Sequence, residues 1–255
     1  AWGHGGSTEN TSYQPAHNPW DIDRIPGGSS GGSAIAISTR MVPFSIGEDT
    51  GGSIRSPANM CNISGLKVTY GRISRLGAIA YASSLDSVGP MAKSVEDLSY
   101  LLEIMAGRDD LDSTSSKTKV DIYSQFLGAP IKEKIIGLPK EFFEKGLDPK
   151  VKKTILDATK VFEKLGAKII EVNLPHFVYG VSIYYLIALS ETSSNLGRYD
   201  SFRFGGKREL FSEETKKRIL LGTYALSAGY ADKLYKKAQK LRTILIEEYN
   251  QALKK

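Results

Sequence analysis

The chain contains 255 residues, of which 41% are hydrophobic and 24% are charged, a composition typical of one large folded domain or two small ones. It has no apolar run of about 18 residues, which excludes a membrane-spanning helix. Its single cysteine, Cys61, excludes an internal disulfide. One cysteine and three histidines also give no zinc-ligand spacing.

The net charge of +6 is unevenly distributed. Residues 1–130 carry 10 Lys and Arg against 13 Asp and Glu, whereas residues 131–255 carry 24 against 15. A basic second half is compatible with RNA binding. Its lysines fall at helical spacing, however, which favours the solvated faces of amphipathic helices over direct RNA contact.

The first half predicts short elements between loops. The first 28 residues are polar and rich in Gly, Asn and Pro, which predicts a loop. Ala34–Arg40 predicts a helix or buried segment, and Val42–Ile46 a short buried strand. Ser53 begins another ordered segment, and Pro57 falls in its first turn, where a helix tolerates proline. Gly65–Gly71 predicts a strand that ends in a turn.

Clear start signals predict two helices, one in each half of the chain. Ser94 begins a capping box, which predicts a helix over Val95–Ala106. Asp148 and Pro149 begin a longer helix that ends at Gly166. The apolar face of that helix is formed by Val151, Ile155, Ala158, Val161, Phe162 and Leu165.

Two predicted strands, Lys134–Leu138 and Ala167–Leu174, flank the longer helix. This strand–helix–strand order predicts an α/β fold with parallel pairing. From Val178 onward the pattern is helical, with breaks near Phe204–Phe211 and Ala228-Gly229.

Serines stand among glycines in two stretches, Pro26–Ser33 and Asp49–Arg55. Glycine lets backbone amides converge on one point, so a serine there can act as a nucleophile with oxyanion donors around it. A flexible linker is the alternative. The runs that join the two stretches resemble a protein core, which favours tight turns on a buried scaffold.

A nucleophilic serine needs a base. The three histidines, His4, His17 and His176, lie in no hydrolase motif, and we expect each to be a surface or loop residue. The sequence also lacks a phosphate-binding loop and a dinucleotide-binding pattern. A relay to a neutral lysine is the remaining way to activate a serine.

The two loops, followed by Pro57 and Gly65-Leu66-Lys67, closely resemble the signature of the amidase signature family. The resemblance implies an α/β amidase signature fold, a mixed β-sheet covered by helices on both faces, here incomplete at both ends. It also implies that Ser53 forms the acyl-enzyme and that Ser29, which follows a cis peptide bond, passes on the proton. The oxyanion hole would consist of the amides of Thr50, Gly51, Gly52 and Ser53.

Within that family the chain resembles the A subunits of glutamyl-tRNA(Gln) amidotransferases, for example over Ser7–Thr11, Tyr70–Arg75 and Lys217–Tyr224. This resemblance implies a glutaminase that supplies ammonia for converting Glu-tRNA(Gln) to Gln-tRNA(Gln). It implies glutamine as substrate and two partners, the tRNA-binding B subunit, which binds most of the tRNA, and the small C subunit. No cofactor is implied in this chain, because the partner uses ATP and Mg.

Substrate binding is implied for Arg218 and for one of Tyr184 and Tyr185. A guanidinium suits the α-carboxylate of glutamine because it can bond in a bidentate manner. The alternatives are a surface helix position for Arg218 and core packing for the tyrosines.

The chain departs from the family pattern in several places. The family's catalytic lysine lies upstream of Ala1, the acid that binds the substrate amine lies beyond Lys255, and Lys67 matches a structural lysine. Glu48 stands where a small polar residue is more usual. We therefore expect an internal fragment of one amidase signature domain, inactive by itself. Residues 1–130 would form its catalytic core and residues 131–255 a helix-rich, substrate-side region.

Two alternatives to the glutaminase remain. One is a stand-alone amidase acting on small amides with the same serines, and the other is an inactive assembly piece. We expect a cytoplasmic location in preference to an organellar one, without membrane association.

Overall fold

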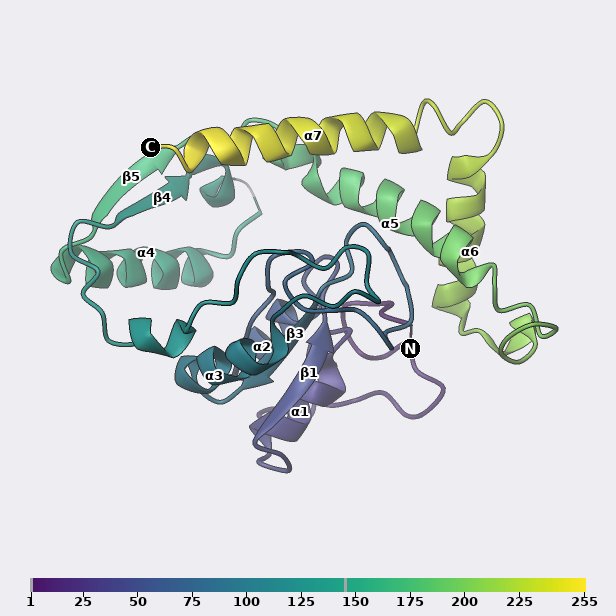
Figure 1. Ribbon diagram of the computed structural model, residues 1–255, viewed down its shortest axis with the longest axis horizontal. Helices are drawn as coiled ribbons and strands as arrows, with labels where there is room; N and C mark the ends of the chain where they lie inside the picture. The colour runs from purple at the N-terminus through teal and green to yellow at the C-terminus, as the bar shows by residue number, and fades with distance from the viewer. Residues whose placement is uncertain (1, 145) are drawn as a thin grey trace. The chain divides into compact units, whose positions relative to one another are not determined.

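The computed structural model describes residues 2–144 and 146–255. These residues form two units (Figure 1). The first unit contains residues 2–127 and 187–230, and the second contains residues 128–186 and 231–255. These units do not test the expected division into a catalytic core of residues 1–130 and a substrate-side region of residues 131–255, which stays a prediction.

An antiparallel sheet of three strands lies in the first unit, in the order β1-β3-β2. Its strands are β1 (Phe44–Glu48), β2 (Ser64–Gly65) and β3 (Val88–Ala92). The expected strand over Gly65–Gly71 is wrong, because the chain leaves the sheet after Gly65. The central strand β3 is not predicted by the sequence, since its Gly89 and Pro90 are unfavourable in strands. Gly89 is needed there, because a Cβ would lie 2.2 Å from the carbonyl oxygen of Leu66.

Two short helices pack beside this sheet, α1 (Gly31–Ser38) and α2 (Arg55–Met60). Helix α1 begins earlier than expected, at Gly31 within the first glycine–serine stretch. Pro57 lies in the first turn of α2, as the sequence predicts. The core between these elements consists of Ala34, Ile37, Ile54, Ala58, Cys61 and Met91.

Helix α3 (Val95–Met105) confirms the capping box, because the Ser94 side chain accepts a hydrogen bond from the amide of Asp97. It packs against β3 and against the short 3-10 helix η1 (Tyr123–Phe126). Arg72 fixes the loop before η1 by donating to the carbonyl oxygens of Thr118 and Lys119.

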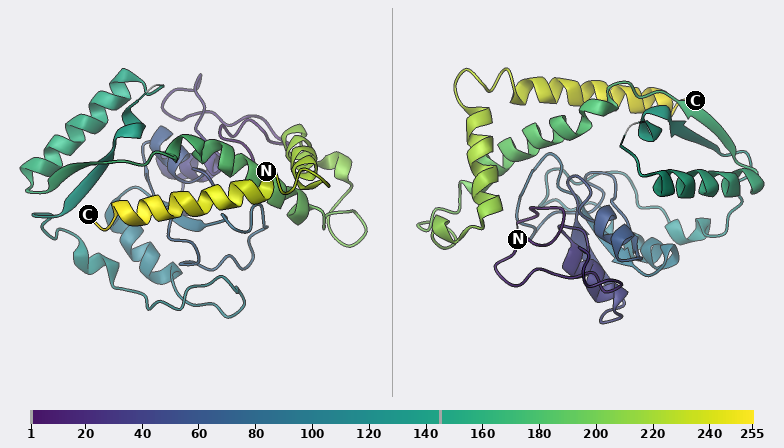
Figure 2. Two further views of the ribbon diagram at one scale, coloured as in Figure 1. Left: turned by 90° about the horizontal axis from the view of Figure 1, so that it is seen from above. Right: turned by 180° about the vertical axis from the view of Figure 1, so that it is seen from behind.

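The second unit contains the expected strand–helix–strand segment (Figure 2). Strands β4 (Ile135–Pro139) and β5 (Lys168–Val172) pair in parallel, and α4 (Pro149–Lys164) connects them and packs on β5. The Asp148 carboxylate caps α4 by accepting from the amide of Lys150 at 2.7 Å. Helix α7 (Tyr235–Ala252) and the 3-10 helices η2 (Lys140–Phe143) and η3 (Phe177–Tyr179) complete the unit.

The apolar face of α4 remains largely exposed. No α4 residue is buried, and side chains such as Ile155 and Val161 remain 40% and 55% exposed. The amphipathic pattern identified the helix correctly, but the two strands of the second unit cover only a small part of its apolar face.

Helix α5 (Gly180–Leu196) begins in the second unit and ends in the first, and α6 (Glu213–Leu226) lies in the first. The 3-10 helix η4 (Arg208–Leu210) precedes α6. The predicted helix breaks near residues 204–211 and 228–229 are confirmed. None of the helices in the described ranges has the length and apolar character needed to cross a bilayer.

The mixed α/β class is confirmed, but the strands are not joined in one mixed sheet. Within the described residues they form a three-stranded antiparallel sheet in one unit and a two-stranded parallel sheet in the other.

Candidate active site

The two glycine–serine loops lie against each other. The amide of Ser30 donates a hydrogen bond of 3.1 Å to the carbonyl oxygen of Ser53. Gly27, at φ +78°, approaches α2 so closely that a Cβ would lie 2.9 Å from the Cα of Pro57. Only glycine permits such an approach. The loops therefore form one packed structure, and a flexible linker is excluded.

The peptide bond between Gly28 and Ser29 is cis, as the family resemblance implies. The N-terminal segment lies directly on this turn, because a Cβ at Gly28 would be 3.0 Å from the backbone nitrogens of Ser7 and Thr8. The Thr8 hydroxyl also donates a 2.7 Å hydrogen bond to the carbonyl oxygen of Gly27. The polar N-terminal loop thus holds the turn that carries Ser29.

The buried carboxylate of Asp49 organises the second loop. It accepts hydrogen bonds from the amides of Gly52 at 2.7 Å and Ile54 at 3.0 Å. The Arg55 side chain adds two more, at 3.0 and 3.1 Å. Burial raises the pKa of Asp49, but the hydrogen bonds from Arg55 and the two amides outweigh it and lower the pKa below its usual value. An ionised Asp49 therefore holds the loop around Ser53.

The four amides expected to bind an oxyanion differ in their contacts. The Gly52 amide points to Asp49, so in this arrangement it is not available to a ligand. The amides of Gly51 and Ser53 donate to no acceptor in the part of the protein that the structure describes. Thr50 is buried. The geometry therefore supports Gly51 and Ser53 as oxyanion donors and counts against Gly52.

The serine hydroxyls also have distinct surroundings. Across residues 2–144 and 146–255, the hydroxyls of Ser29 and Ser53 make no hydrogen bond to protein, which leaves them available to a substrate. The Ser30 hydroxyl is instead fixed to β1, where it accepts from the Glu48 amide at 3.2 Å and lies 3.3 Å from the Glu48 carbonyl oxygen. Ser30 therefore has a structural role, and Ser29 is the serine free to relay a proton.

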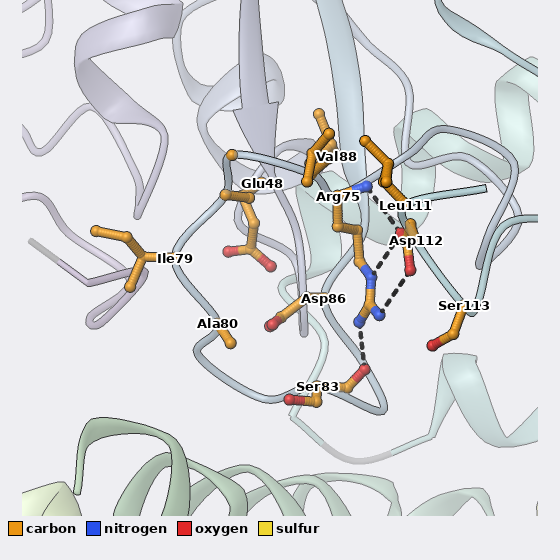
Figure 3. A pocket seen from close by; sticks show the side chains of 13 residues that line it. Glu48, Arg75, Ile79, Ala80, Ser83, Asp86, Val88, Leu111, Asp112 and Ser113 are labelled. Carbon is orange, nitrogen blue, oxygen red and sulfur yellow. Dashed lines mark hydrogen bonds and ion pairs between the residues drawn. The ribbon is translucent and has the colours of Figure 1, made fainter. Parts of the chain in front are cut away.

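Two adjoining hollows lie beside these loops and share Glu48, Leu76, Ala78 and Val88. The first, of about 640 Å³, contains Ser29 and is called the Ser29 hollow. The second, of about 290 Å³, is called the Glu48 hollow (Figure 3). Glu48 thus lies on the wall common to both.

In the Glu48 hollow most charges are compensated. The Arg75 side chain binds the Asp112 carboxylate and donates to the carbonyl oxygen of Ser83. Glu48 differs, because neither of its enclosed carboxylate oxygens has a hydrogen-bond partner among the described residues. Burial, helped by the nearby carboxylates of Asp86 and Asp49, raises the pKa of Glu48 to about 8, although the backbone amide of Ser87, which lies nearby without meeting the geometry of a hydrogen bond, opposes the shift.

Lys67 has a structural environment. Its Nζ donates a 2.9 Å hydrogen bond to the carbonyl oxygen of Val68. Burial lowers its pKa, and the positive charge of Arg55 adds to this effect while Asp49 opposes it. No contact links Lys67 to either serine hydroxyl in the described chain.

Arg218 lies buried in the first unit and is already paired. Its Nη1 donates to the hydroxyl of Tyr81 and its Nε to the carboxylate of Glu214, both at 2.7 Å. The alternative of a surface helix position is therefore excluded, whereas the role of Arg218 in binding glutamine stays a prediction.

Tyr184 and Tyr185 lie in the second unit, where their rings form an edge-to-face pair with centroids 5.2 Å apart. Tyr184 is half-buried and Tyr185 is exposed. The choice between them as a substrate-binding residue stays open.

The histidines are not part of the serine site. His4 lies in the N-terminal loop, in line with the expected surface or loop position, but it is buried there, and its Nδ1 lies 2.9 Å from the Thr215 hydroxyl. His176 is paired with Glu248 in the second unit, and His17 is exposed. Within the described ranges, no group of three or more His, Cys, Asp and Glu residues is placed to hold a metal ion.

A family model described as Amidase matches residues 1–255. The chain belongs to the amidase family. The A subunit of the glutamyl-tRNA(Gln) amidotransferase of Listeria monocytogenes is 52% identical, over 96% of this chain and 54% of the relative. The protein of the same name from a Geobacillus species is 49% identical, over 98% of this chain and 55% of the relative.

Solved structures of amidase-family proteins agree with this assignment. A crystal structure of the A subunit of the Thermotoga maritima glutamyl-tRNA(Gln) amidotransferase has a TM-score of 0.85 and 42% identity, and covers 99% of this chain and 54% of that one. A bacterial aryl acylamidase of the amidase signature family has a TM-score of 0.81 and 26% identity, over 98% and 51% of the two chains. The amidase signature fold is therefore confirmed. The chain spans about half the length of the curated relatives it matches.

Sequence reasoning missed the residues that shape this amidase-family site. It assigned no role to Asp49. An aspartate shortly before a glycine-rich turn can nevertheless accept hydrogen bonds from the backbone amides of that turn. It noted Glu48 only as a departure from the family pattern. Tyr81 was not singled out at all, because its contact with Arg218 joins distant parts of the sequence.

Proposed function

We propose that the complete protein is the glutaminase subunit of a tRNA-dependent amidotransferase. The observation that carries the proposal is the packing of the Ser29 turn against the Ser53 loop, joined by the hydrogen bond from Ser30 to Ser53. The relatives are named as A subunits of glutamyl-tRNA(Gln) amidotransferases, which supports glutamine as the amide that is hydrolysed.

The reaction begins when the Ser53 hydroxyl oxygen attacks the side-chain carbonyl carbon of glutamine. The Ser53 proton passes to the Ser29 oxygen, and the Ser29 proton passes to a base. The amides of Gly51 and Ser53 hold the oxyanion of the tetrahedral intermediate. The C–N bond then breaks, the base returns a proton to the leaving nitrogen, and ammonia departs from an acyl-enzyme that water hydrolyses to glutamate.

The base is a lysine in the portion of the relatives' length that this chain does not span. Lys67 is unsuited to the role, since its Nζ donates to the Val68 carbonyl oxygen. Arg218 binds the α-carboxylate of glutamine, and Tyr184 or Tyr185 contributes to substrate binding.

The partners are the tRNA-binding B subunit, which contacts most of the tRNA, and the small C subunit. The B subunit uses ATP and Mg to activate Glu-tRNA(Gln), so this chain needs no cofactor of its own. The assembly works in the cytoplasm.

The test uses the complete protein in its complex with the partner subunits. Ser53→Ala should abolish glutaminase activity, and Ser29→Ala should lower kcat by at least about 10³-fold, as removal of a catalytic group does in serine hydrolases. Ser99→Ala is the matched control, because Ser99 lies on α3 outside the glycine–serine loops, its hydroxyl donates to the carbonyl oxygen of Glu96, and its loss should leave kcat unchanged.

Two results would contradict the proposal. Retained glutaminase activity in Ser53→Ala would remove Ser53 as the nucleophile. Hydrolysis of small amides by the wild-type protein, without ATP-dependent transamidation and without a co-purifying tRNA-binding partner, would indicate a stand-alone amidase instead.

A further inference from the structure

Among the described residues that line the Glu48 hollow, Glu48 is the ionisable residue whose side chain has neither an ion-pair partner nor a hydrogen-bond partner. Both of its carboxylate oxygens are enclosed and have no hydrogen-bond partner there. An enclosed ion without a partner is strongly unfavourable, so such a group is normally paired or neutral.

The neighbouring charges do not supply a partner. Arg75 is committed to Asp112, at 3.3 Å from each carboxylate oxygen that it contacts. Asp86 is satisfied by the amides of Tyr81 and Ala82, at 3.1 and 2.8 Å. None of these neighbours offers a cation to Glu48, so its carboxyl group is ionised at neutral pH only when a cation from outside the described residues pairs with it.

The backbone of Asp49 follows Glu48, but the Asp49 carboxylate is neutralised by Arg55. A side chain at residue 3 would approach the Glu48 carboxylate, since a Cβ on Gly3 would lie 3.1 Å from Oε2. The Gly3 backbone therefore closes one side of Glu48 without contributing a charge. The groups facing Glu48 are thus Asp49, Asp86, Arg75 and Asp112, and none of them is an available cation.

The position of Glu48 relative to Ser29 is fixed by the intervening structure. The Ser30 hydroxyl contacts both the amide nitrogen and the carbonyl oxygen of Glu48, so the backbone of the Ser29 turn is clamped to the end of β1. Both Ser29 and Glu48 line the Ser29 hollow. A cation that pairs with Glu48 from this side therefore lies in the same hollow as Ser29.

We propose that Glu48 is a positioning residue whose carboxylate pairs with the ammonium form of the base that receives the Ser29 proton. This inference rests on the proposed function. In the reaction, a neutral amine takes the proton from the Ser29 oxygen and becomes an ammonium ion. Glu48 compensates that charge until the proton moves to the leaving nitrogen, which departs as ammonia, so Glu48 itself takes no part in the proton transfer.

The pairing has a measurable consequence for pH dependence. An opposite charge within about 4–6 Å favours the charged form of an amine and raises its pKa by about 1–3 units. Activity requires the neutral amine, so Glu48 shifts the acid limb of the pH profile upward. Glu48→Gln should shift this limb downward by at least about one pH unit.

The experiment measures kcat/KM for glutamine against pH in the complete protein within its assembled complex. In parallel it measures the rate at which a fluorophosphonate, a reagent for activated serines, modifies the protein at each pH. Glu96→Gln is the control, because Glu96 is an exposed acid on α3 and its removal changes the net charge equally. In Glu48→Gln the acid limbs of the kcat/KM profile and of the modification-rate profile should both shift to lower pH. In Glu96→Gln both limbs should coincide with those of the wild type.

The outcomes separate the two proposals. Acid limbs of Glu48→Gln that coincide with those of the wild type would overturn the role of Glu48. A wild-type protein without glutaminase activity would contradict the proposed function, while the fluorophosphonate profile would still test Glu48. If Glu48→Gln does not fold, Glu48→Ser, which places a small neutral polar residue there, should give the same downward shift, and a limb unchanged in that variant would equally overturn the pairing.

Discussion

The guanidinium of Arg218 donates a 2.7 Å hydrogen bond to the hydroxyl of Tyr81 and a second bond of 2.7 Å to the carboxylate of Glu214. The positive charge is thus held within the first unit by one acidic and one neutral partner. A guanidinium held in this way is preorganised for a carboxylate, which it can bind in a bidentate manner.

If Arg218 binds the α-carboxylate of glutamine, Arg218→Lys should raise KM for glutamine about 10-fold to 100-fold, because a lysine cannot reproduce the bidentate geometry. Tyr81→Phe should raise KM by a smaller factor. The change in kcat should be smaller than the change in KM for both variants. Arg198→Lys is the control, because the exposed Arg198 bonds only to the nearby Asn195 carbonyl oxygen. An unchanged KM in Arg218→Lys would reduce Arg218 to a structural ion pair.

Asp49 should be essential to the loop that carries Ser53. Asp49→Asn removes a buried carboxylate that accepts several hydrogen bonds. The asparagine side chain is neutral, and its NH₂ group would face donors from the backbone or from Arg55. Arg55 would also lose its ion-pair partner. We expect a loss of about 2–4 kcal/mol in the free energy of unfolding, together with loss of glutaminase activity. Urea denaturation and an ammonia-release assay measure the two effects.

Asp21→Asn provides the comparison for Asp49. Asp21 forms an exposed ion pair with Arg24, three residues away, and such pairs contribute little to stability. Its unfolding midpoint should match that of the wild type. Equal stability of Asp49→Asn and Asp21→Asn would show that the Asp49 network does not hold the loop.

Local signals in the sequence predicted the elements they act on. Ser94 and Asp148 cap the helices they were expected to begin, because capping depends on residues within one helical turn. The sequence also predicted that the glycine–serine stretches form tight turns on a buried scaffold. That prediction succeeded because the residues that make each turn are consecutive in the sequence.

Features that depend on distant contacts were not predicted. Strand β3 contains Gly89 and Pro90, and it forms because its neighbours β1 and β2 lie on either side of it. The burial of His4 depends on Thr215 and Tyr81, which are far away in the sequence. No pattern of period two or 3.6 records such contacts, so composition and periodicity could not reveal them.

Close packing of α5 and α6 gives a third prediction, at Gly222. A Cβ added there would lie 1.9 Å from the carbonyl oxygen of Leu189, a backbone atom that cannot rotate away. Gly222→Ala should therefore lower the free energy of unfolding by at least about 2 kcal/mol, as overpacking does. Gly32→Ala is the matched control, because Gly32 lies in α1 with no atom near its would-be Cβ. Alanine's greater helix propensity should make that control neutral or stabilising by up to about 1 kcal/mol. Similar unfolding curves for the two variants would contradict the close contact.

The last prediction concerns acid sensitivity and His4. Burial, followed by the positive charge of Arg218, lowers the pKa of His4 to about 3 from its usual 6.5. The unfolded chain therefore binds a proton below pH 6.5 that the folded protein does not bind until near pH 3. Stability contributed by the neutral ring is complete above pH 6.5 and is lost as the pH falls toward 3.

Between pH 6.5 and pH 4 this loss amounts to roughly 3 kcal/mol. His4→Asn removes the titrating group, so its free energy of unfolding should fall less steeply with decreasing pH than that of the wild type. Urea denaturation at pH 7, 5.5 and 4 gives the free energy of unfolding of both proteins as a function of pH. The difference between the two slopes cancels the contributions of the other titratable groups. His17→Asn, at an exposed position, should keep the wild-type slope. Parallel pH dependence in His4→Asn and the wild type would mean that His4 is not the group whose burial makes the fold sensitive to acid.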